Sequence, residues 1–451
     1  MLFKDGRPWV FAIFATVVFG SALGNLSQTG VNAMLVTMCA EFGIGAGVGQ
    51  ALTTTYMLVL GSVVPLSTYL MGRFRLKDLA VGAIALFSAG SAVCAFAGGF
   101  GWVFAGRVMQ AVAAGVLMPT LQTMAMTRFP EGRKATAMGI AGVAMGFAPN
   151  IGPTIGGAMV DAWGWRSFFV LLALLSAAAA LFCLVFVARR DDASFPAGLD
   201  AFSFALSTAG FGGVLVGCSQ ASSLPLAHPL VWGPVAAGAA LVVWFVVRQL
   251  RVSDPLVDMG IFRDATYRAG FCAQCLLCAS FMGITLLVPL YVEGLRGGTP
   301  LEAGLVLLPG TIAALVVNPL AGMLTDKAGA RPVALVAGAL LFAGALSMVL
   351  CDESTPLWVV CVMQGVRSLG VSGLIGPLSS WSLMRLEGRR VAHGSAFGLA
   401  ARQTCASVGT ALMVFCVEGA SLSGASGFHA AFAVSAALAA ATFACIVARV
   451  R

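Results

Sequence analysis

Long apolar runs separated by short polar connections make up almost the whole chain. Each run has about 20 residues or more, which is enough for an α-helix to cross a hydrocarbon core of about 30 Å. Fourteen runs are present, with centres near residues 20, 58, 88, 114, 147, 176, 210, 239, 280, 313, 342, 367, 405 and 438. The pattern predicts an all-α polytopic membrane protein with fourteen transmembrane helices, and twelve helices with two wrongly assigned runs is the alternative.

Two parts of the chain resemble each other. "PLSTYLMGRFRLK" begins at Pro65 and "PLAGMLTDKAGAR" begins at Pro319, and each stands where an apolar run ends. Duplicated halves are typical of secondary transporters, whose substrate site lies between the halves near the middle of the membrane. The predicted division is a six-helix half at 1–190, two extra helices at 191–263 and a second six-helix half at 264–451.

The run centred near residue 147 contains unusually poor helix formers. Glycine and proline recur in it at steps of three and four residues, at Gly142, Gly146, Pro149, Pro153 and Gly156. Proline removes backbone hydrogen bonds and bends a helix, while small residues let two helix backbones approach closely in lipid. We expect a bent, tightly packed helix–helix contact, which between the halves of a transporter would act as a seal or a pivot.

The composition excludes a soluble enzyme. Of the 451 residues, 59% are hydrophobic and 10% are charged, whereas a soluble domain has about 25% charged residues. The sequence contains no G-x-x-x-x-G-K-[ST] nucleotide-binding motif. Cys272, Cys275 and Cys278 are spaced like metal ligands, but they lie in an apolar run without a nearby histidine, so packing is favoured over a metal site. We therefore expect no metal and no cofactor.

The net charge of +8 does not indicate a nucleic-acid partner, because the basic residues follow the predicted membrane topology. Of the 26 lysines and arginines, 21 fall in connections on one side of the membrane and two, Arg166 and Arg296, fall on the other. The positive-inside rule makes the side with 21 cytoplasmic. Both termini of this multi-pass protein are therefore expected on the cytoplasmic side of the plasma membrane.

Taken together, these segments resemble the major facilitator superfamily, and specifically its fourteen-helix drug:proton antiporter branch. "APNIGPTIGG" (148–157) is similar to the antiporter motif of that branch, and "RVMQAVAAG" (107–115) to its fourth-helix motif. "PLAGMLTDKAGAR" is similar to a cytoplasmic loop motif of the family, and "ARQTCASVG" (401–409) also resembles the branch. The positions that the resemblance makes gating or packing residues are Gly152, Pro153, Gly156, Gly157, Gly322, Asp326, Gly329 and Arg331.

Two positions depart from the pattern of that branch. Its first helix usually carries an aspartate where this chain has Ser27, within "LSQTGVN" (26–32). Its first cytoplasmic loop motif usually carries an aspartate where this chain has Gly72. The resemblance implies proton coupling, so the first departure affects the expected proton site. The second removes a charged latch from the amino-terminal half, whereas Asp326 keeps it on the other half.

The predicted membrane interior holds three arginines, Arg107, Arg367 and Arg402, and no carboxylate. Ionisable residues inside a membrane are functional candidates by default, so each is either a substrate or coupling residue or a structural group that bonds to backbone carbonyls. Because arginine stays protonated, a coupling proton needs another group. The candidates are Glu293, Asp161 and Glu418, near the outer ends of their helices. Glu293, near the outer end of the ninth helix, is favoured, and a solvated carboxylate at the rim is the alternative for it.

Uncharged polar side chains in the same runs are candidates for a substrate cavity, and hydrogen bonding between helices is the alternative role for each. They are Gln28, Asn32, Tyr56, Gln110, Asn150, Gln274 and Asn318.

The sequence thus predicts a secondary active exporter of small amphipathic compounds that acts as a monomer in the lipid bilayer. Protons are the coupling ion that the resemblance implies. The alternatives are a facilitator or permease for an organic anion or another metabolite, and a membrane sensor that transports nothing. Because arginines are the only interior charges, anionic, zwitterionic or neutral substrates are favoured over quaternary ammonium compounds.

Overall fold

The computed structural model describes residues 8–187, 200–220, 228–252, 255–418 and 425–450, and within these ranges the chain forms helices and no strands. Each of the fourteen predicted centres falls inside a different long α-helix, which confirms the all-α membrane fold. The helices are α1 Pro8–Phe42, α2 Ala46–Arg73, α3 Leu76–Ala95, α4 Phe100–Thr127, α5 Lys134–Trp163, α6 Trp165–Phe186, α7 Ala201–Gln220, α8 Pro229–Gln249, α9 Ala265–Pro289, α10 Pro300–Ala328, α11 Ala330–Met348, α12 Leu357–Leu383, α13 Arg389–Glu418 and α14 Ala425–Arg449. Short helical segments also occur at η1 Glu131–Arg133, η2 Met259–Arg263 and η3 Leu290–Leu295.

Thirteen of the described helices are long and apolar enough to cross a membrane, and α5 is the long helix that is not among them. Its glycines, prolines and asparagine lower its hydropathy. Helix α5 packs against α1, α4, α6, α10 and α12, so other helices rather than lipid cover much of its surface. This environment suits a segment with small side chains and freed backbone carbonyls.

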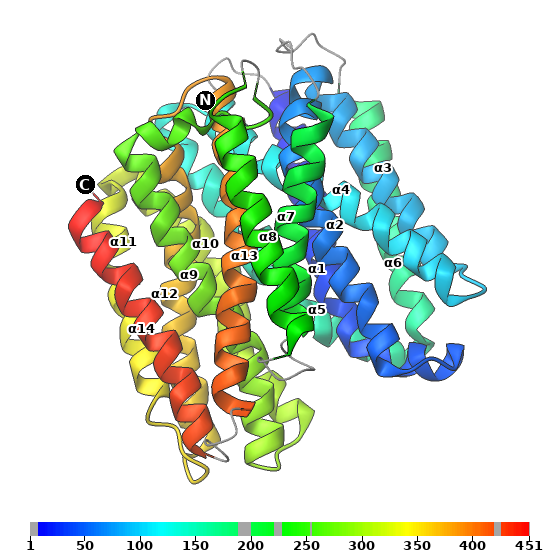
Figure 1. Ribbon diagram of the computed structural model, residues 1–451, viewed down its shortest axis with the longest axis vertical. Coiled ribbons are helices and arrows are strands. Elements are labelled where there is room, and N and C mark those ends of the chain that lie inside the picture. Colours follow the sequence, from blue (N-terminus) through cyan, green and yellow to red (C-terminus); the bar gives the residue numbers. More distant parts are fainter. Residues whose placement is uncertain (1–7, 188–199, 221–227, 253–254, 419–424, 451) are drawn as a thin grey trace.

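The long helices form two groups with a pair between them. Helices α1–α6 pack among themselves, as do α9–α14, while α7 and α8 pack on each other and α7 packs against α2 and α13. In Figure 1 the first group lies on the right and the second on the left, with α7 and α8 in front of the junction. We keep the division at residues 190 and 263 as a proposal, because the first boundary lies outside the described residues.

The α7–α8 pair is tied together by polar contacts at one end. Arg248 Nη2 donates to Asp200 Oδ2 at 3.0 Å, and Gln249 Nε2 donates to Ser203 Oγ at 2.6 Å. Burial alone would raise the pKa of the Asp200 carboxyl, but hydrogen bonds from the hydroxyl and backbone N–H of Ser203 and from Arg248 hold it below its usual value. Thr68 Oγ1 in α2 donates to the carbonyl of Leu256 at 2.9 Å, which fixes the segment after α8 to the first group.

The connections rich in Lys and Arg gather at one end of the bundle, which we call the basic end. Helix α1 begins there and α14 ends there, in the upper part of Figure 1.

The topology is tested by single cysteines at Lys134, Arg389 and Glu302 in a cysteine-free background. Lys134 and Arg389 begin α5 and α13, and Glu302 lies in the first turn of α10. We expect an impermeant maleimide added to intact cells to label position 302 and to label 134 and 389 only after permeabilisation. Labelling of position 389 in intact cells would overturn the assignment of the basic end to the cytoplasm.

Candidate functional site

A cavity of about 110 Å³ lies between the two helix groups and is lined by α1, α4, α5, α9, α12 and α13. Its polar wall consists of Asn25, Gln28, Thr29, Gln274, Ser379, Arg402 and Gln403. Its apolar wall consists of Met118, Met145, Pro149, Leu277, Cys278, Phe281, Met282, Val371, Ile375, Leu399 and Ala406. Among the described residues that line the cavity, Arg402 carries the only charge. A largely apolar wall with few polar groups is typical of a small-molecule site.

Arg402 joins three helices of the second group at the cavity wall. Its side chain is 7% exposed, and Nη1 donates to Gln274 Oε1 in α9 and to Ser379 Oγ in α12, the latter at 3.3 Å. Ser379 Oγ in turn donates to Gln274 Oε1 at 3.0 Å. Arg402 Nη2 is buried without a hydrogen-bond partner. The network orients the guanidinium but leaves its positive charge without a counter-ion.

Arg107 in α4 is fully buried within the first group and does not line the cavity. Its Nη1 donates to Ser27 Oγ at 2.7 Å, to the Ser27 carbonyl at 3.2 Å and to Gln110 Oε1 at 2.9 Å. Gln110 Nε2 donates to Ser91 Oγ at 2.7 Å. The guanidinium carbon lies 4.1 Å from the ring centroid of Tyr56, a cation–π contact. Arg107 thus joins α1, α2, α3 and α4.

Ser27 is the residue that stands where the resemblance leads one to expect an aspartate. Its hydroxyl accepts from Arg107 and donates to Gln110 Oε1 at 3.0 Å, so a carboxylate at this position would lie beside the guanidinium. In this chain a neutral hydroxyl takes that place, and Arg107 Nε and Nη2 have no hydrogen-bond partner.

The remaining candidates lie apart from the cavity wall. Arg367 in α12 is fully buried, and its Nη2 donates to the Ser280 carbonyl at 2.8 Å. Asn32 is exposed and accepts from Thr53 Oγ1 at 2.9 Å. Glu293 is exposed in η3 at the end opposite the basic end.

Asn32 lies on α1 beyond the cavity, on the side away from the basic end. It lies one helical turn beyond Gln28 on the same face of α1, and Gln28 lines the cavity with 7% exposure. This face of α1 therefore becomes uncovered toward the end where Glu293 lies.

The glycine stripe of α5 contacts two different partners. A Cβ atom on Gly142 would lie 3.1 Å from Asn318 Oδ1 in α10, whereas one on Gly156 would lie 2.6 Å from the Gly30 carbonyl oxygen in α1. A Cβ atom on Gly152 would lie 2.2 Å from Thr29 Oγ1, also in α1. Gly152 and Gly156 pack closely against α1 of their own group. The stretch of α5 nearer the basic end contacts α10 of the other group, and the role of the motif as a seal or pivot stays a prediction.

Pro153 in α5 frees a backbone carbonyl that a side chain of α1 satisfies. Pro153 has no N–H to bond the Pro149 carbonyl, and Thr29 Oγ1 in α1 donates to that oxygen at 2.8 Å. Asn150 Nδ2 donates at 2.9 Å to the Gly146 carbonyl, which neither proline frees, so this side chain bonds within its own helix. Pro149 itself lines the cavity. The kink-prone segment is therefore held by α1 at the level where the cavity lies.

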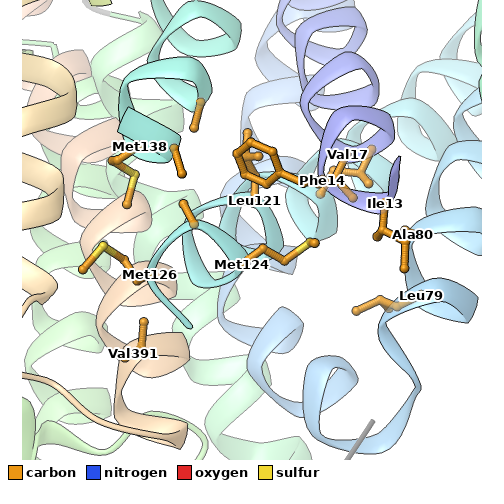
Figure 2. Close-up of a cluster of buried hydrophobic side chains, with 14 of the residues drawn as sticks. Ile13, Phe14, Val17, Leu79, Ala80, Leu121, Met124, Met126, Met138 and Val391 are labelled. Atoms are coloured by element: carbon orange, nitrogen blue, oxygen red, sulfur yellow. The ribbon is translucent and has the colours of Figure 1, made fainter. Parts of the chain in front are cut away.

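Near the basic end the two groups are in direct contact. A Cβ atom on Gly139 would lie 2.4 Å from the Asn318 carbonyl oxygen, and one on Gly322 would lie 2.3 Å from that of Ala135. Asn318 Nδ2 donates to the Gly142 carbonyl at 3.1 Å. Figure 2 shows Met126, Met138 and Val391, from α4, α5 and α13, in one apolar cluster here.

Asp326 at the end of α10 caps α5 across this contact. Its carboxylate accepts from the backbone N–H of Ala135 at 3.0 Å and of Thr136 at 2.7 Å, and from Thr136 Oγ1 at 2.5 Å. Helix α5 has no capping side chain of its own, so Asp326 supplies both the acceptor and the negative charge that a helix N-terminus favours. We call this contact the Asp326 latch.

The structure explains one of two other residues in the loop motif that contains Asp326, namely Gly329, but does not explain Arg331. Gly329 adopts φ +87°, a conformation that glycine reaches without strain. Arg331 is exposed at the start of α11, and nothing in the structure explains its match to the motif. The glycine contacts and the Asn318 and Asp326 hydrogen bonds join the two groups near the basic end.

Sequence reasoning missed Asn25, Ser379 and Gln403 as lining residues. Asn25 precedes the candidate Gln28 by three positions on one face of α1, and Gln403 adjoins Arg402, so both had a local signal. Ser379 had none, because serines are common in helices as small packing residues.

The chain matches known transporter sequences. A family model described as the Major Facilitator Superfamily matches residues 17–412 and 270–451. An uncharacterised MFS-type transporter, YhcA of Bacillus subtilis, is 33% identical over 402 residues, which cover 89% of this chain and 75% of that protein. The lincomycin resistance protein LmrB of Listeria monocytogenes is 28% identical over 89% of this chain and 85% of its own length.

Solved structures match the fold. The human organic anion transporter MFSD10 (TETRAN) superposes with a TM-score of 0.67 at 15% identity, covering 98% of this chain and all of that chain. The proton:xylose symporter XylE gives the same TM-score at 12% identity, with 97% and 95% covered.

Proposed function

The chain belongs to the major facilitator superfamily, and on that premise we propose that this membrane transporter exports small amphipathic compounds across the plasma membrane. The central cavity carries the proposal. It lies between two helix groups, as expected of a transporter that exposes one site alternately to each side. Relatives named for lincomycin and multidrug resistance support drug-like compounds as the substrates.

The size of the cavity supports a transport cycle with a change of shape. Its volume of about 110 Å³ is smaller than the roughly 300–1,000 Å³ of sites that hold drug-sized ligands. The two groups must therefore move apart to accept such a compound. We propose that the Asp326 latch and the glycine contacts of α5 with α10 close the cytoplasmic side, and that both termini lie in the cytoplasm of a monomer.

Proton coupling is a further part of the proposal. The described cavity wall has no carboxylate or histidine, and arginine stays protonated, so no group in that wall titrates near neutral pH. We propose Glu293 as the coupling residue, since its exposed position places its carboxylate in contact with the external medium.

The export proposal is tested with inverted membrane vesicles and a panel of neutral and anionic fluorescent compounds. We expect vesicles that contain the protein to accumulate at least one compound about three-fold or more above vesicles that lack it. Collapse of the pH gradient with nigericin should abolish accumulation, and Glu293→Gln should reduce it about ten-fold. Accumulation of no compound, with folded protein present, would favour the sensor alternative. Uptake that survives nigericin but only equilibrates the compound across the membrane would favour a facilitator.

A further inference from the structure

We infer that the central cavity contains an anion subsite at Arg402, so that the transported compounds are amphipathic organic acids with an apolar body and one negative group. This inference rests on the proposed transport function and specifies its substrate class.

The first step is the unbalanced charge of Arg402. Its Nη1 is bonded to the uncharged acceptors Gln274 Oε1 and Ser379 Oγ, and its Nη2 is buried without a partner. No carboxylate among the described residues forms an ion pair with it. A buried charge without a counter-ion is costly, and a bound anion would relieve that cost.

Tyr267 and Asp326 do not neutralise this charge. Tyr267 on α9 lines a pocket together with Arg402, but it donates its proton to the Gly394 carbonyl at 2.9 Å and is therefore a neutral group. The acidic residue Asp326 of the latch lies at the cytoplasmic contact, on Ala135 and Thr136. The positive potential of Arg402 thus reaches the cavity without internal cancellation.

The other two interior arginines are excluded from this role by their positions. Arg107 is enclosed by α1–α4 and bonded to Ser27 and Gln110, and Arg367 is bonded to the Ser280 carbonyl. Neither lines the cavity, and both are fully buried. Only Arg402 stands in the wall that a substrate meets.

The rest of the wall defines the remainder of the ligand. Met118, Met145, Phe281 and Met282 present flexible or aromatic apolar surface to the cavity, which suits a variable hydrophobic body. Gln403, next to Arg402, adds an amide that can donate to an acidic oxygen. A compound with a flat apolar ring and a sulfonate or carboxylate matches both parts.

The experiment uses three fluorescent compounds that share one dimethylaminonaphthalene body. They are dansylate, which is anionic, dansylamide, which is neutral, and a cationic derivative that carries a trimethylammonium group in place of the sulfonate. Their binding is measured by fluorescence titration with the purified full chain in nanodiscs of phosphatidylcholine, so that the lipid carries no net charge. We expect dansylate to bind at least ten-fold more tightly than the trimethylammonium compound.

Arg402→Gln should weaken dansylate binding about ten-fold or more while changing dansylamide binding less than three-fold. Arg402→Lys should keep part of the preference, because the charge remains but the planar fork is lost. Arg296→Gln is the matched control, since it removes one positive charge at the opposite, external end of the bundle. Retained dansylamide binding reports that the variants are folded.

An unchanged ratio of dansylate to dansylamide affinity in Arg402→Gln would overturn the subsite, as would equal binding of the trimethylammonium compound by the unmodified protein. Different results would contradict the subsite and the export proposal. Binding of dansylate that depends on Arg402, without accumulation in vesicles, would contradict export alone. Accumulation of dansylamide and of the cation, with no effect of Arg402→Gln, would contradict the subsite alone.

Discussion

Replacing Gly156 with leucine is expected to abolish transport and to reduce the yield of folded protein. A Cβ atom on Gly156 would lie 2.6 Å from the Gly30 carbonyl oxygen and 3.3 Å from its carbonyl carbon. The atoms in the way belong to the backbone of α1, so they cannot move aside as a flexible side chain would. Overpacking of this kind costs about 3 kcal/mol or more where backbones must separate, and the leucine side chain enlarges the separation further.

The adjacent glycine provides a matched control. A Cβ atom on Gly157 would approach nothing closer than the Cβ of Ala33, at 4.0 Å, which is an ordinary contact. Gly157→Ala should therefore transport normally, whereas Gly156→Ala should already lose most activity. The measurements are fluorescence-detected size-exclusion chromatography of the solubilised protein and dye accumulation in vesicles. Equal behaviour of the two alanine variants would show that the contact between α1 and α5 is not tight.

The architecture could be predicted from the sequence because its signals are long. A run of about 20 apolar residues has few alternatives to a membrane-spanning helix, and each of the fourteen predicted centres lies in a helix. The bend at Pro149 and the small residues of α5 were likewise local signals. The helix that packs against these small residues could not be predicted, because helical spacing defines a face but does not identify the helix that covers it. Gly152 and Gly156 therefore turned out to contact α1.

The site could be predicted only in part, for the same physical reason. Three buried arginines and the absence of interior carboxylates were visible in the sequence, but the rotation of each helix decides which arginine meets the cavity. Arg107 had the stronger motif and proved to be enclosed by its own group, whereas Arg402 lines the cavity. The two acceptors of Arg402, Gln274 in α9 and Ser379 in α12, are 128 and 23 residues away from it in the sequence. No local sequence pattern could therefore predict this hydrogen-bond network.

Removing the Asp326 carboxylate is expected to open the cytoplasmic side. The carboxylate accepts three hydrogen bonds from Ala135 and Thr136, and bonds to a charged acceptor contribute roughly 1.5–3 kcal/mol each. Asp326→Ala should therefore shift the equilibrium toward the cytoplasm-open state by at least about 3 kcal/mol, which is roughly 100-fold or more. The measurement is alkylation of Met145→Cys, placed in the cavity wall in a cysteine-free background, by a charged thiol reagent added from the cytoplasmic side of inverted vesicles. Lys327→Gln is the control, because it changes an exposed neighbouring charge without touching α5.

The internal repeat offers a second-site test of the same latch. Aligning Pro65 with Pro319 places Gly72 opposite Asp326, and Gly72 lines a cavity of about 310 Å³ together with Gly388, Arg389 and Ala392 at the start of α13. An aspartate at position 72 would have this cavity available and could approach the N-terminus of α13, whose positive helix dipole favours a carboxylate, as Asp326 does on α5. Gly72→Asp should slow alkylation of Met145→Cys and should partly reverse the effect of Asp326→Ala. Faster alkylation in Gly72→Asp, with folded protein, would contradict an equivalent latch at α13.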